Sequence, residues 1–224
     1  MFGKRLINTQ QEGPCTTDTL QILGDTSCVA TYRLNGDATD LSGNYNGTAT
    51  NVTYVTGQFG DAGSFNGSSS KIVVPSGFPL GSSERSVSCW VKSTNTTSNQ
   101  TLLQYGVGGT PYYFFVFRLN GLNNSSLEFS DWNSEYSVSA SSIFDGEFHH
   151  CVLTYNGSLM QFYLDGNTLG GTNSTSLNTQ AGSVGIGAYN TGTVSLNGQL
   201  DQVRIFNKAI TSTEVRTLYN EVAC

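Results

Sequence analysis

Short runs in which apolar and polar residues alternate dominate the chain, and this period of two predicts β-strands. The clearest pair of runs lies in residues 145–166, on either side of the dipeptide Asn156-Gly157. Asn-Gly is the strongest short-range signal for a β-hairpin, because a type I′ turn needs positive φ at both central residues. The pattern therefore predicts a hairpin whose turn is centred on Asn156 and Gly157.

A helical pattern is confined to residues 211–220. Thr211 and Glu214 are spaced as a capping box, in which each side chain satisfies a free backbone N–H of the other residue. Val215 and Leu218 then fall on one face of the expected helix. We predict one short helix after the last strand.

Composition also favours an all-β fold. The 224 residues include 26 glycines, and 12% of the residues are charged. β-Branched and aromatic residues come in short runs separated by clusters of Asn, Gly, Ser and Thr, as the strands of an antiparallel sandwich or jelly roll require. A chain of this length is sufficient for one large β-domain.

Several blocks of sequence, in order along the chain, resemble one known family. The hairpin text in residues 145–166, including FHHCVLTYNG and FYLDG, is similar to the central hairpin of laminin-G-like domains in the concanavalin A-like lectin and glucanase superfamily. The further blocks are residues 29–66, 86–92, 196–206 and 211–220. The resemblance implies a concanavalin A-like antiparallel β-sandwich (jelly roll) with one short C-terminal helix, formed by residues 27–224.

Charge and hydropathy exclude two classes of partner. The net charge is −6 with a pI of about 4.7, and the ten basic residues are scattered along the chain. A nucleic-acid-binding protein needs several cations on one face, so we expect no nucleic-acid partner. The longest apolar run, residues 112–117, ends at Arg118 and is too short to insert across a membrane.

The five cysteines are an odd number, so at least one cannot pair within the chain. Cys89 and Cys151 lie inside predicted strands, and we interpret them as small buried residues with inert thiols. Cys15 and Cys28 are thirteen residues apart and could form a bridge in an oxidising environment. Whether these two pair stays open at this point.

Residues 1–26 have no counterpart in laminin-G-like domains, and we predict an extended N-terminal docking arm. The segment is rich in Thr and Gln and cannot build its own core, so it would order by adding to a partner. Its expected apolar anchors are Phe2, Leu6, Ile7, Leu20, Ile22 and Leu23. The alternative is that the arm packs along a sheet edge of its own domain.

The opening text GKRLINT, followed by CTTDTLQIL and a laminin-G-like domain, resembles small virion proteins of tailed bacteriophages, particularly marine ones. That resemblance implies a capsid decoration, fibre or tail-associated protein on the virion surface, with other virion proteins as partners and assembly as a homo-oligomer. After Leu6 and Ile7 the chain turns polar at once, unlike a secretory signal peptide. We therefore expect synthesis in the host cytoplasm without a signal peptide.

The loop of residues 35–43 is a candidate calcium site. Asp37 and Asp40 supply carboxylates, and neighbouring glycines free backbone carbonyls, which are the hard oxygen ligands that Ca²⁺ prefers. The resemblance implies a third ligand from the last long strand, where Asp201 is the matching residue. The alternative is that these Asp side chains build turns by bonding their own backbone.

Catalysis is not expected, although glycoside hydrolases share the implied fold. Paired acids of the glucanase branch lie on one face of a strand, at even spacing. The most similar stretch of this sequence contains Glu128, Asp131 and Glu135. Glu128 and Asp131 are separated by an odd number of positions, so a strand would place them on opposite faces. We predict a non-enzymatic protein.

Carbohydrate binding is suggested by aromatic residues among amides and hydroxyls. A lectin site needs an aromatic ring for the apolar face of a sugar and polar groups for its hydroxyls. The candidates are Trp132, Tyr136 and Tyr112, with Tyr113 beside the last of them. Two functions therefore remain: a virion structural protein that displays a lectin-like domain, for which host surface glycans are a candidate ligand, or a free-standing carbohydrate-binding module or adhesin. A glycan-active enzyme is a distant third.

Overall fold

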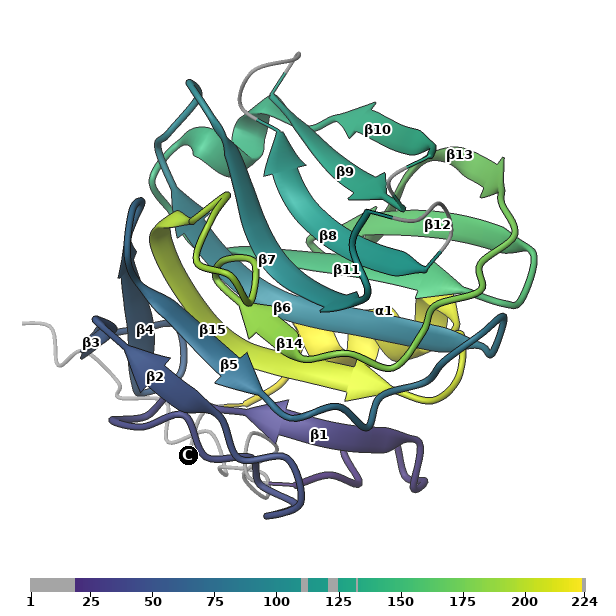
Figure 1. Ribbon diagram of the computed structural model, residues 1–224. Helices are drawn as coiled ribbons and strands as arrows, with labels where there is room; N and C mark the ends of the chain where they lie inside the picture. Colours follow the sequence, from purple (N-terminus) through teal and green to yellow (C-terminus); the bar gives the residue numbers. More distant parts are fainter. Residues whose placement is uncertain (1–18, 110–112, 121–124, 132, 223–224) are drawn as a thin grey trace, which may run out of the picture.

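Two antiparallel sheets face each other in the computed structural model, which describes residues 19–109, 113–120, 125–131 and 133–222. In the eight-stranded sheet, neighbouring strands follow the order β13 (Asn167–Ser174), β12 (Leu159–Leu164), β11 (His149–Tyr155), β6 (Arg85–Ser93), β15 (Asn197–Phe206), β4 (Asp61–Asn66) and β3 (Thr53–Thr56), with β1 (Cys28–Tyr32) also paired to β15. In the seven-stranded sheet the order is β10 (Glu135–Ser139), β9 (Ser126–Ser130), β8 (Phe114–Asn120), β7 (Asn99–Gly106), β14 (Val184–Ile186), β5 (Lys71–Val74) and β2 (Thr48–Thr50). The predicted concanavalin A-like antiparallel sandwich is confirmed (Figure 1).

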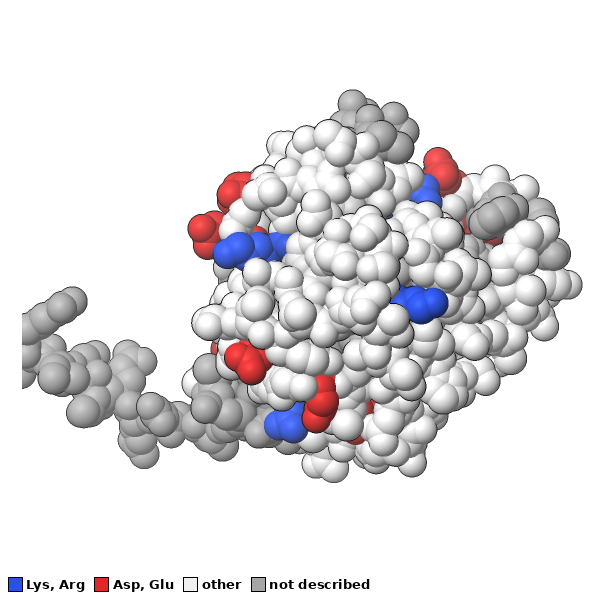
Figure 2. Space-filling model, turned by 60° about the vertical axis from the view of Figure 1, so that its left-hand side comes forward, with Lys and Arg blue, Asp and Glu red and all other residues white. Residues whose placement is uncertain are grey.

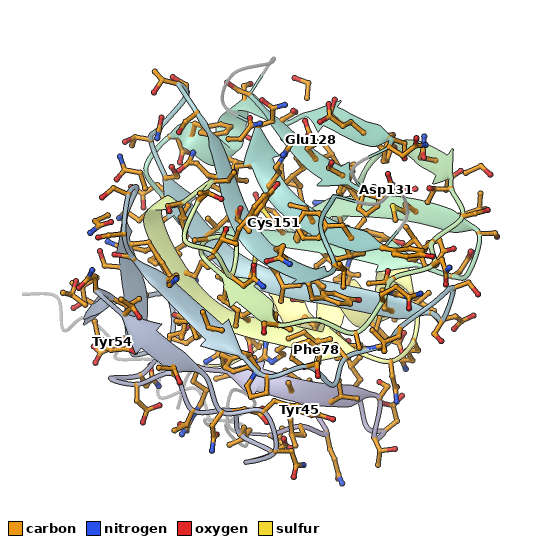
Figure 3. All side chains as sticks on the ribbon, in the orientation of Figure 1. Tyr45, Tyr54, Phe78, Glu128, Asp131 and Cys151 are labelled. Atoms are coloured by element: carbon orange, nitrogen blue, oxygen red, sulfur yellow. The ribbon has the colours of Figure 1, made fainter. Side chains whose placement is uncertain are left out.

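Alternating residues of the two sheets fill the space between them. On β8, Phe115, Phe117 and Leu119 point into the main core, and on β11 Leu153 does so too. Cys151 lies in the same core, opposite Cys89 on the neighbouring strand (Figure 3). Burial raises the pKa of both thiols. The interpretation of these two cysteines as small buried residues is therefore confirmed.

The predicted hairpin is present between β11 and β12, but its turn is displaced by one residue. Tyr155 pairs with Met160, so the central residues are Gly157 and Ser158. Gly157 has a φ of +94°, whereas Asn156 is not among the residues with positive φ. The predicted type I′ turn is wrong here, since one positive φ at the first central residue is the pattern of type II′.

Asn156 contributes its side chain instead of a left-handed backbone. Its Oδ1 accepts hydrogen bonds from the backbone N–H groups of Ser158 at 3.1 Å and Leu159 at 2.8 Å. The type I′ pattern appears in the next hairpin, between β12 and β13, where Asp165 and Gly166 have φ of +48° and +74°. Asn156-Gly157 thus predicted the position of the loop between β11 and β12 correctly. The hydrogen bonds of the Asn156 side chain stabilise a turn of another type than the predicted one.

The predicted helix, α1 (Ser212–Tyr219), begins with its capping box. Thr211 Oγ1 accepts from the backbone N–H of Glu214 at 3.3 Å, and Glu214 Oε2 accepts from that of Thr211 at 2.7 Å. Val215 and Leu218 are buried against the outer face of the eight-stranded sheet. Figure 1 shows α1 behind that sheet. Among the described residues, no helix is long and apolar enough to cross a membrane.

The described part of the predicted arm packs on its own domain. Leu20, Ile22 and Leu23 contact a second apolar cluster on the outer face of the eight-stranded sheet. The cluster consists of Cys28, Val152, Tyr163, Phe206, Ile210, Val215 and Leu218. For these three leucine and isoleucine residues the intramolecular alternative holds, on the helix side of the sheet rather than at its edge. Phe2, Leu6, Ile7 and Cys15 lie outside the described residues, so the Cys15–Cys28 question stays open.

Charged side chains are dispersed over the face of the molecule that Figure 2 shows. Figure 2 shows one face on which Lys, Arg, Asp and Glu appear as separate spots on a mostly uncharged surface. A duplex-binding surface would gather cations in a stripe, and this face has none.

Candidate functional site

The outer face of the seven-stranded sheet carries a polar row across its three edge-side strands. Strand alternation turns Arg118 of β8 away from the core, directly opposite Glu128 of β9. Ser130 of β9 is in turn opposite Glu135 of β10. The antiparallel register therefore gathers one basic and two acidic side chains on one face, from three strands.

Arg118 joins both acidic residues. Its Nε donates to Glu128 Oε1 at 2.6 Å, and its Nη2 contacts Glu128 Oε1 and also Glu135 Oε1, the latter at 3.0 Å. Nη1 donates to the hydroxyl of Tyr189 at 3.4 Å. The second oxygen of Glu128 accepts from Asn120 Nδ2. Burial lowers the pKa of Arg118, but the charge of Glu128 opposes this and the net direction is upward, so the guanidinium stays charged.

The turn between β9 and β10 is held by a buried carboxylate. Asp131 Oδ1 accepts hydrogen bonds from the backbone N–H of Asn133 at 2.9 Å and that of Ser134 at 2.7 Å. The Ser134 hydroxyl donates to the same oxygen at 3.1 Å. Such an Asx turn fixes the direction in which Asn133 and Ser134 leave the sheet.

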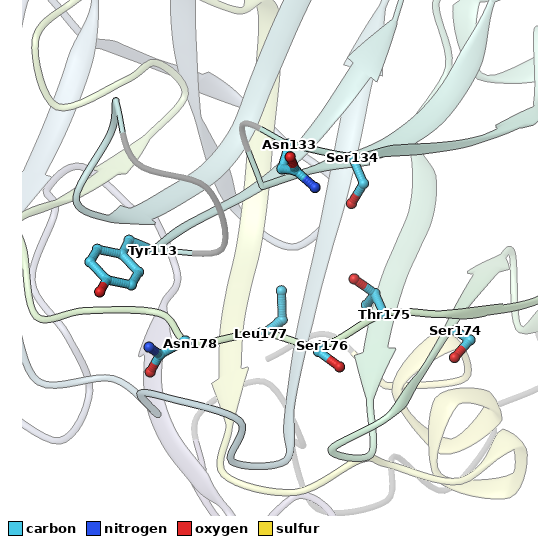
Figure 4. A pocket seen from close by; sticks show the side chains of 8 residues that line it. All are labelled: Tyr113, Asn133, Ser134, Ser174, Thr175, Ser176, Leu177 and Asn178. Carbon is cyan, nitrogen blue, oxygen red and sulfur yellow. The ribbon is translucent and has the colours of Figure 1, made fainter.

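A cavity of about 440 Å³ lies beside this turn. Its wall carries an aromatic ring, an apolar floor and several hydroxyl and amide groups, as Figure 4 shows, from Tyr113, Asn133, Ser134, Ser174, Thr175, Ser176, Leu177 and Asn178. Binding sites for small molecules typically have volumes of roughly 300–1,000 Å³ and combine apolar surface with a few placed polar groups. The cavity fits this description.

The segment after β13, which forms one wall of the cavity, is hydrogen-bonded to the core. The hydroxyl of buried Tyr155 accepts from the backbone N–H of Leu177 at 3.2 Å and donates to the carbonyl of Thr175 at 3.4 Å. The carbonyl of Tyr113 accepts from the backbone N–H of Gln180 at 3.2 Å. These bonds hold the segment after β13 in place, so the polar side chains on it are presented from a fixed backbone.

A second cavity of about 460 Å³ adjoins the first and shares Asn133 and Ser134 with it. Its other lining residues are Arg118, Ser130, Glu135 and Tyr189. We call the two cavities together the β9–β10 groove. The groove thus runs from the ring of Tyr113 to the charged row on the sheet.

The structure gives one of the three predicted sugar-binding residues, Tyr136, a packing role. Tyr136 stacks on Phe162, with ring centroids 5.1 Å apart, and its hydroxyl donates to the carbonyl of Gly171. Tyr136 therefore ties edge strand β10 to β13 and closes the edge of the sandwich. Tyr112 and Trp132 lie outside the described residues, but their sequence neighbours Tyr113 and Asn133 both line the first cavity.

The predicted calcium ligands are occupied by backbone donors. Asp40 Oδ1 accepts from Thr31 N–H at 2.8 Å, and Asp37 Oδ1 accepts from Thr39 N–H at 2.9 Å. In the described part of the chain, no group of three or more His, Cys, Asp or Glu residues is placed to hold a metal ion. Asp37, Asp40 and Asp201 are thus not gathered around one point, and calcium binding stays a prediction.

Asp201 anchors a neighbouring loop. Its Oδ2 accepts from the backbone N–H of Phe59 at 2.8 Å, while its Oδ1 is buried without a hydrogen-bond partner. Burial raises the pKa of Asp201 to about 7. A bulge between Asp201 and Arg204 in β15 lets both side chains face outward.

The carboxylates of Glu128 and Asp131 bond to different parts of the protein. Glu128 points to Arg118 and Asn120, whereas the bonds of Asp131 go to its own turn, and Figure 3 labels both. Spacing along the sequence named Glu135 but did not reveal that it meets Glu128 through Arg118, from the next strand. Arg118 carried the available signal, because it interrupts an otherwise apolar strand.

This fold and groove define a lectin-like β-sandwich. The chain belongs to the Concanavalin A-like lectin/glucanases superfamily, whose laminin-G-type family model matches residues 66–216. A comparison with curated protein sequences finds no match.

Solved structures support the same classification. Domain 4 of AbnA, a GH43 extracellular arabinanase from Geobacillus stearothermophilus, solved in complex with arabinotriose, has a TM-score of 0.70 and 25% sequence identity, over 87% of this chain and 98% of that domain. The binding domain of Paraclostridial Mosquitocidal Protein 1 has a TM-score of 0.67 and 16% identity, over 87% of this chain and 52% of that one. Trypanosoma rangeli sialidase has a TM-score of 0.67 and 16% identity, over 87% of this chain and 33% of that one. The chain thus spans about half of the toxin domain and a third of the sialidase, and these two share the fold.

Proposed function

We propose that the protein is a non-catalytic carbohydrate-binding domain and that its ligand is an oligosaccharide held in the β9–β10 groove. The observation that carries this proposal is the first cavity, where the ring of Tyr113 stands among hydroxyl and amide side chains on an anchored backbone. An aromatic ring can lie against the apolar face of a sugar, while hydroxyls and amides exchange hydrogen bonds with its hydroxyl groups.

The likeness to the arabinanase domain supports a pentose oligosaccharide as a first ligand. That domain was solved with arabinotriose, and this chain covers 98% of it at 25% identity. Arabinotriose is therefore the probe of choice. It is uncharged and long enough to contact more than one part of a groove.

The absence of catalysis is part of the proposal. Both oxygens of Glu128 already accept hydrogen bonds, from Arg118 and from Asn120. A general acid must turn a free carboxyl oxygen toward the glycosidic oxygen, and Glu128 has none to offer. Incubation of the protein with arabinan oligosaccharides should therefore release no shorter products.

The test is calorimetric titration of the protein with arabinotriose, comparing wild type with Tyr113→Ala. We expect roughly tenfold weaker binding in the variant, because loss of an aromatic contact costs about 1–1.5 kcal/mol. Tyr54→Ala is the matched control, since Tyr54 is also half-buried and lies on β3, far from Glu128 and Asp131 in Figure 3. Equal binding by wild type and Tyr113→Ala, or no binding by any tested oligosaccharide, would refute the proposal.

We further propose that the domain is displayed on the surface of a phage particle, as a homo-oligomer attached through residues 1–18. The support is the resemblance of the opening sequence to small phage virion proteins. The packing of Leu20, Ile22 and Leu23 on the domain sharpens the test, because these residues stabilise the fold and must be kept.

Deletion of residues 1–18 should abolish incorporation into particles while leaving oligosaccharide affinity unchanged. Incorporation is measured by mass spectrometry of purified particles made with either the full or the shortened chain. Normal occupancy of the shortened chain would contradict attachment through this segment.

A further inference from the structure

Glu135 gives the second cavity of the β9–β10 groove its available charge. The cavity is lined by one guanidinium, one carboxylate, the phenol of Tyr189 and small polar side chains. The side chains of Arg118 and Glu128 are 9% and 2% exposed, whereas that of Glu135 is 61% exposed. A ligand entering from solvent therefore meets the carboxylate of Glu135 first.

The positive charge of Arg118 is already committed to protein groups. Glu128 accepts from Nε and lies against Nη2, Glu135 accepts from Nη2, and Tyr189 accepts from Nη1. A guanidinium recognises a ligand carboxylate through a fork of two parallel N–H groups. Here the fork of Nε and Nη2 faces Glu128, so it is not presented to the cavity.

The row of charges is also unbalanced. Arg118 contributes one positive charge, and Glu128 and Glu135 contribute two negative ones. The net negative charge lies at the exposed end, where Glu135 accepts hydrogen bonds but repels a second anion. Sugar hydroxyls are suitable donors for this carboxylate, and a uronic or sialic acid carboxylate is not.

We propose that the β9–β10 groove selects uncharged oligosaccharides against acidic ones, with Glu135 as the discriminating residue and Arg118 as the residue that positions it. This inference rests on the proposed carbohydrate-binding function and names its ligand class. Tyr189 belongs to the same arrangement, because its hydroxyl accepts from Nη1 of the guanidinium whose Nη2 donates to Glu135.

Backbone register supports the positioning role of Arg118. Glu135 begins β10 directly after the Asx turn and pairs with Ser130. Ser130 lies two residues along β9 from Glu128, which pairs with Arg118. The Arg118 side chain bridges that step and holds the Glu135 carboxylate over the cavity. The discriminating charge is thereby fixed by three strands rather than by a free side chain.

The experiment measures the affinity of full-length wild type and Glu135→Gln for six trisaccharides. Three are uncharged, namely arabinotriose, galactotriose and fully methyl-esterified trigalacturonic acid. Three are acidic, namely trigalacturonic acid, trimannuronic acid and sialyllactose. Glu147→Gln is the matched control, since Glu147 is an exposed carboxylate on a different loop, before β11.

We expect wild type to bind at least one uncharged trisaccharide at least tenfold more tightly than every acidic one. Glu135→Gln should reduce that ratio about fivefold, because glutamine keeps the hydrogen-bond acceptor and removes the charge, and Glu147→Gln should leave it unchanged. Raising the salt concentration to about 1 M should reduce the wild-type ratio as well, since the exposed carboxylate is screened.

Two results overturn the inference in distinguishable ways. If uncharged trisaccharides bind but acidic ones bind equally well, or if Glu135→Gln leaves the ratio unchanged, the selection by Glu135 is wrong and the proposed function stands. If none of the six binds, the proposed function itself fails and this inference fails with it.

Discussion

The two outer faces of the sandwich each contain a buried Arg–Glu pair, and the two pairs differ in what lies over them. On the eight-stranded sheet, Arg204 donates to both carboxylate oxygens of Glu221, at 3.0 and 2.6 Å, and both side chains are fully buried. On the seven-stranded sheet, Arg118 is bound to Glu128 but also to Glu135, which is largely exposed.

The covering elements explain this difference. Helix α1 packs on the eight-stranded sheet, and Glu221 follows it closely, so its carboxylate is carried down onto Arg204. On the seven-stranded sheet, Glu135 belongs to edge strand β10 and borders a cavity. The covered Arg204–Glu221 pair thus has both charges available only to the fold, whereas the Arg118–Glu128 pair is extended to solvent by the second acid, Glu135.

Removing the covered acid should have the largest effect on stability. We expect Glu221→Gln to reduce the free energy of unfolding by about 3–5 kcal/mol, because Arg204 would remain buried without a counter-charge. Urea denaturation followed by tryptophan fluorescence measures the change. Glu135→Gln, which removes the exposed acid, should cost less than about 1 kcal/mol. Similar losses for both variants would erase the proposed difference between the faces.

The covered face should also make the protein sensitive to acid through His150. This residue is fully buried, its Nε2 lies 2.8 Å from Ser88 Oγ, and burial, with the nearby charge of Arg204, lowers its pKa to about 3. In the unfolded chain, His150 takes up a proton near pH 6.5. Above that pH the residue is neutral in both states and does not reduce the free energy of unfolding, whereas between pH 6.5 and pH 3 only the unfolded state is protonated and the free energy of unfolding falls. The expected loss is about 1.4 kcal/mol per pH unit within this window.

His150→Gln should accordingly remove about 2 kcal/mol of the fall in unfolding free energy between pH 7 and pH 5, relative to wild type. His149→Gln is the matched control with the opposite sign. Burial lowers the pKa of His149, but the hydrogen bonds that its ring donates to the carboxylates of Asp165 and Asp145 outweigh this and raise it. Its contribution is therefore present at low pH and lost as the pH rises. Parallel pH profiles for wild type and His150→Gln would contradict the assignment.

The smallest expected effect is that of calcium. A site filled at about 100 times its Kd stabilises by about 2.7 kcal/mol, or roughly 5–10 °C for a domain of this size. Because backbone N–H groups occupy oxygens of Asp37 and Asp40, we expect a melting midpoint within about 1 °C in saturating calcium and in chelator. A rise of several degrees, lost in Asp40→Asn, would show that the loop does hold the ion.

Much of the fold was predictable because its signals are local. The alternation in β11, the loop marked by Asn156 and the capping box of Thr211 each depend on a few neighbouring residues. The predicted turn type was wrong because the Asn156 side chain accepts backbone hydrogen bonds within the turn, and Asn156 does not adopt the left-handed backbone conformation. The local sequence determines where a loop forms more reliably than it determines the backbone dihedral angles within that loop.

The groove was less predictable because it depends on register. Arg118, Glu128 and Glu135 come together only when β8, β9 and β10 pair in one particular alignment, and sequence spacing within a single strand does not reveal this. For Tyr136, the sequence predicted a binding role where the structure shows a packing role. It is an aromatic residue on a polar strand, as a sugar platform would be, but it stacks on Phe162 to close the sandwich.

The most direct test of the account is to locate bound arabinotriose by nuclear magnetic resonance, using ¹⁵N-labelled full-length protein. We expect saturable shifts of the backbone amides of Asn133, Ser134 and residues 174–178, with none at α1. Shifts centred on α1, or no shifts at millimolar arabinotriose, would contradict the claim that the face carrying the β9–β10 groove is the one that binds carbohydrate.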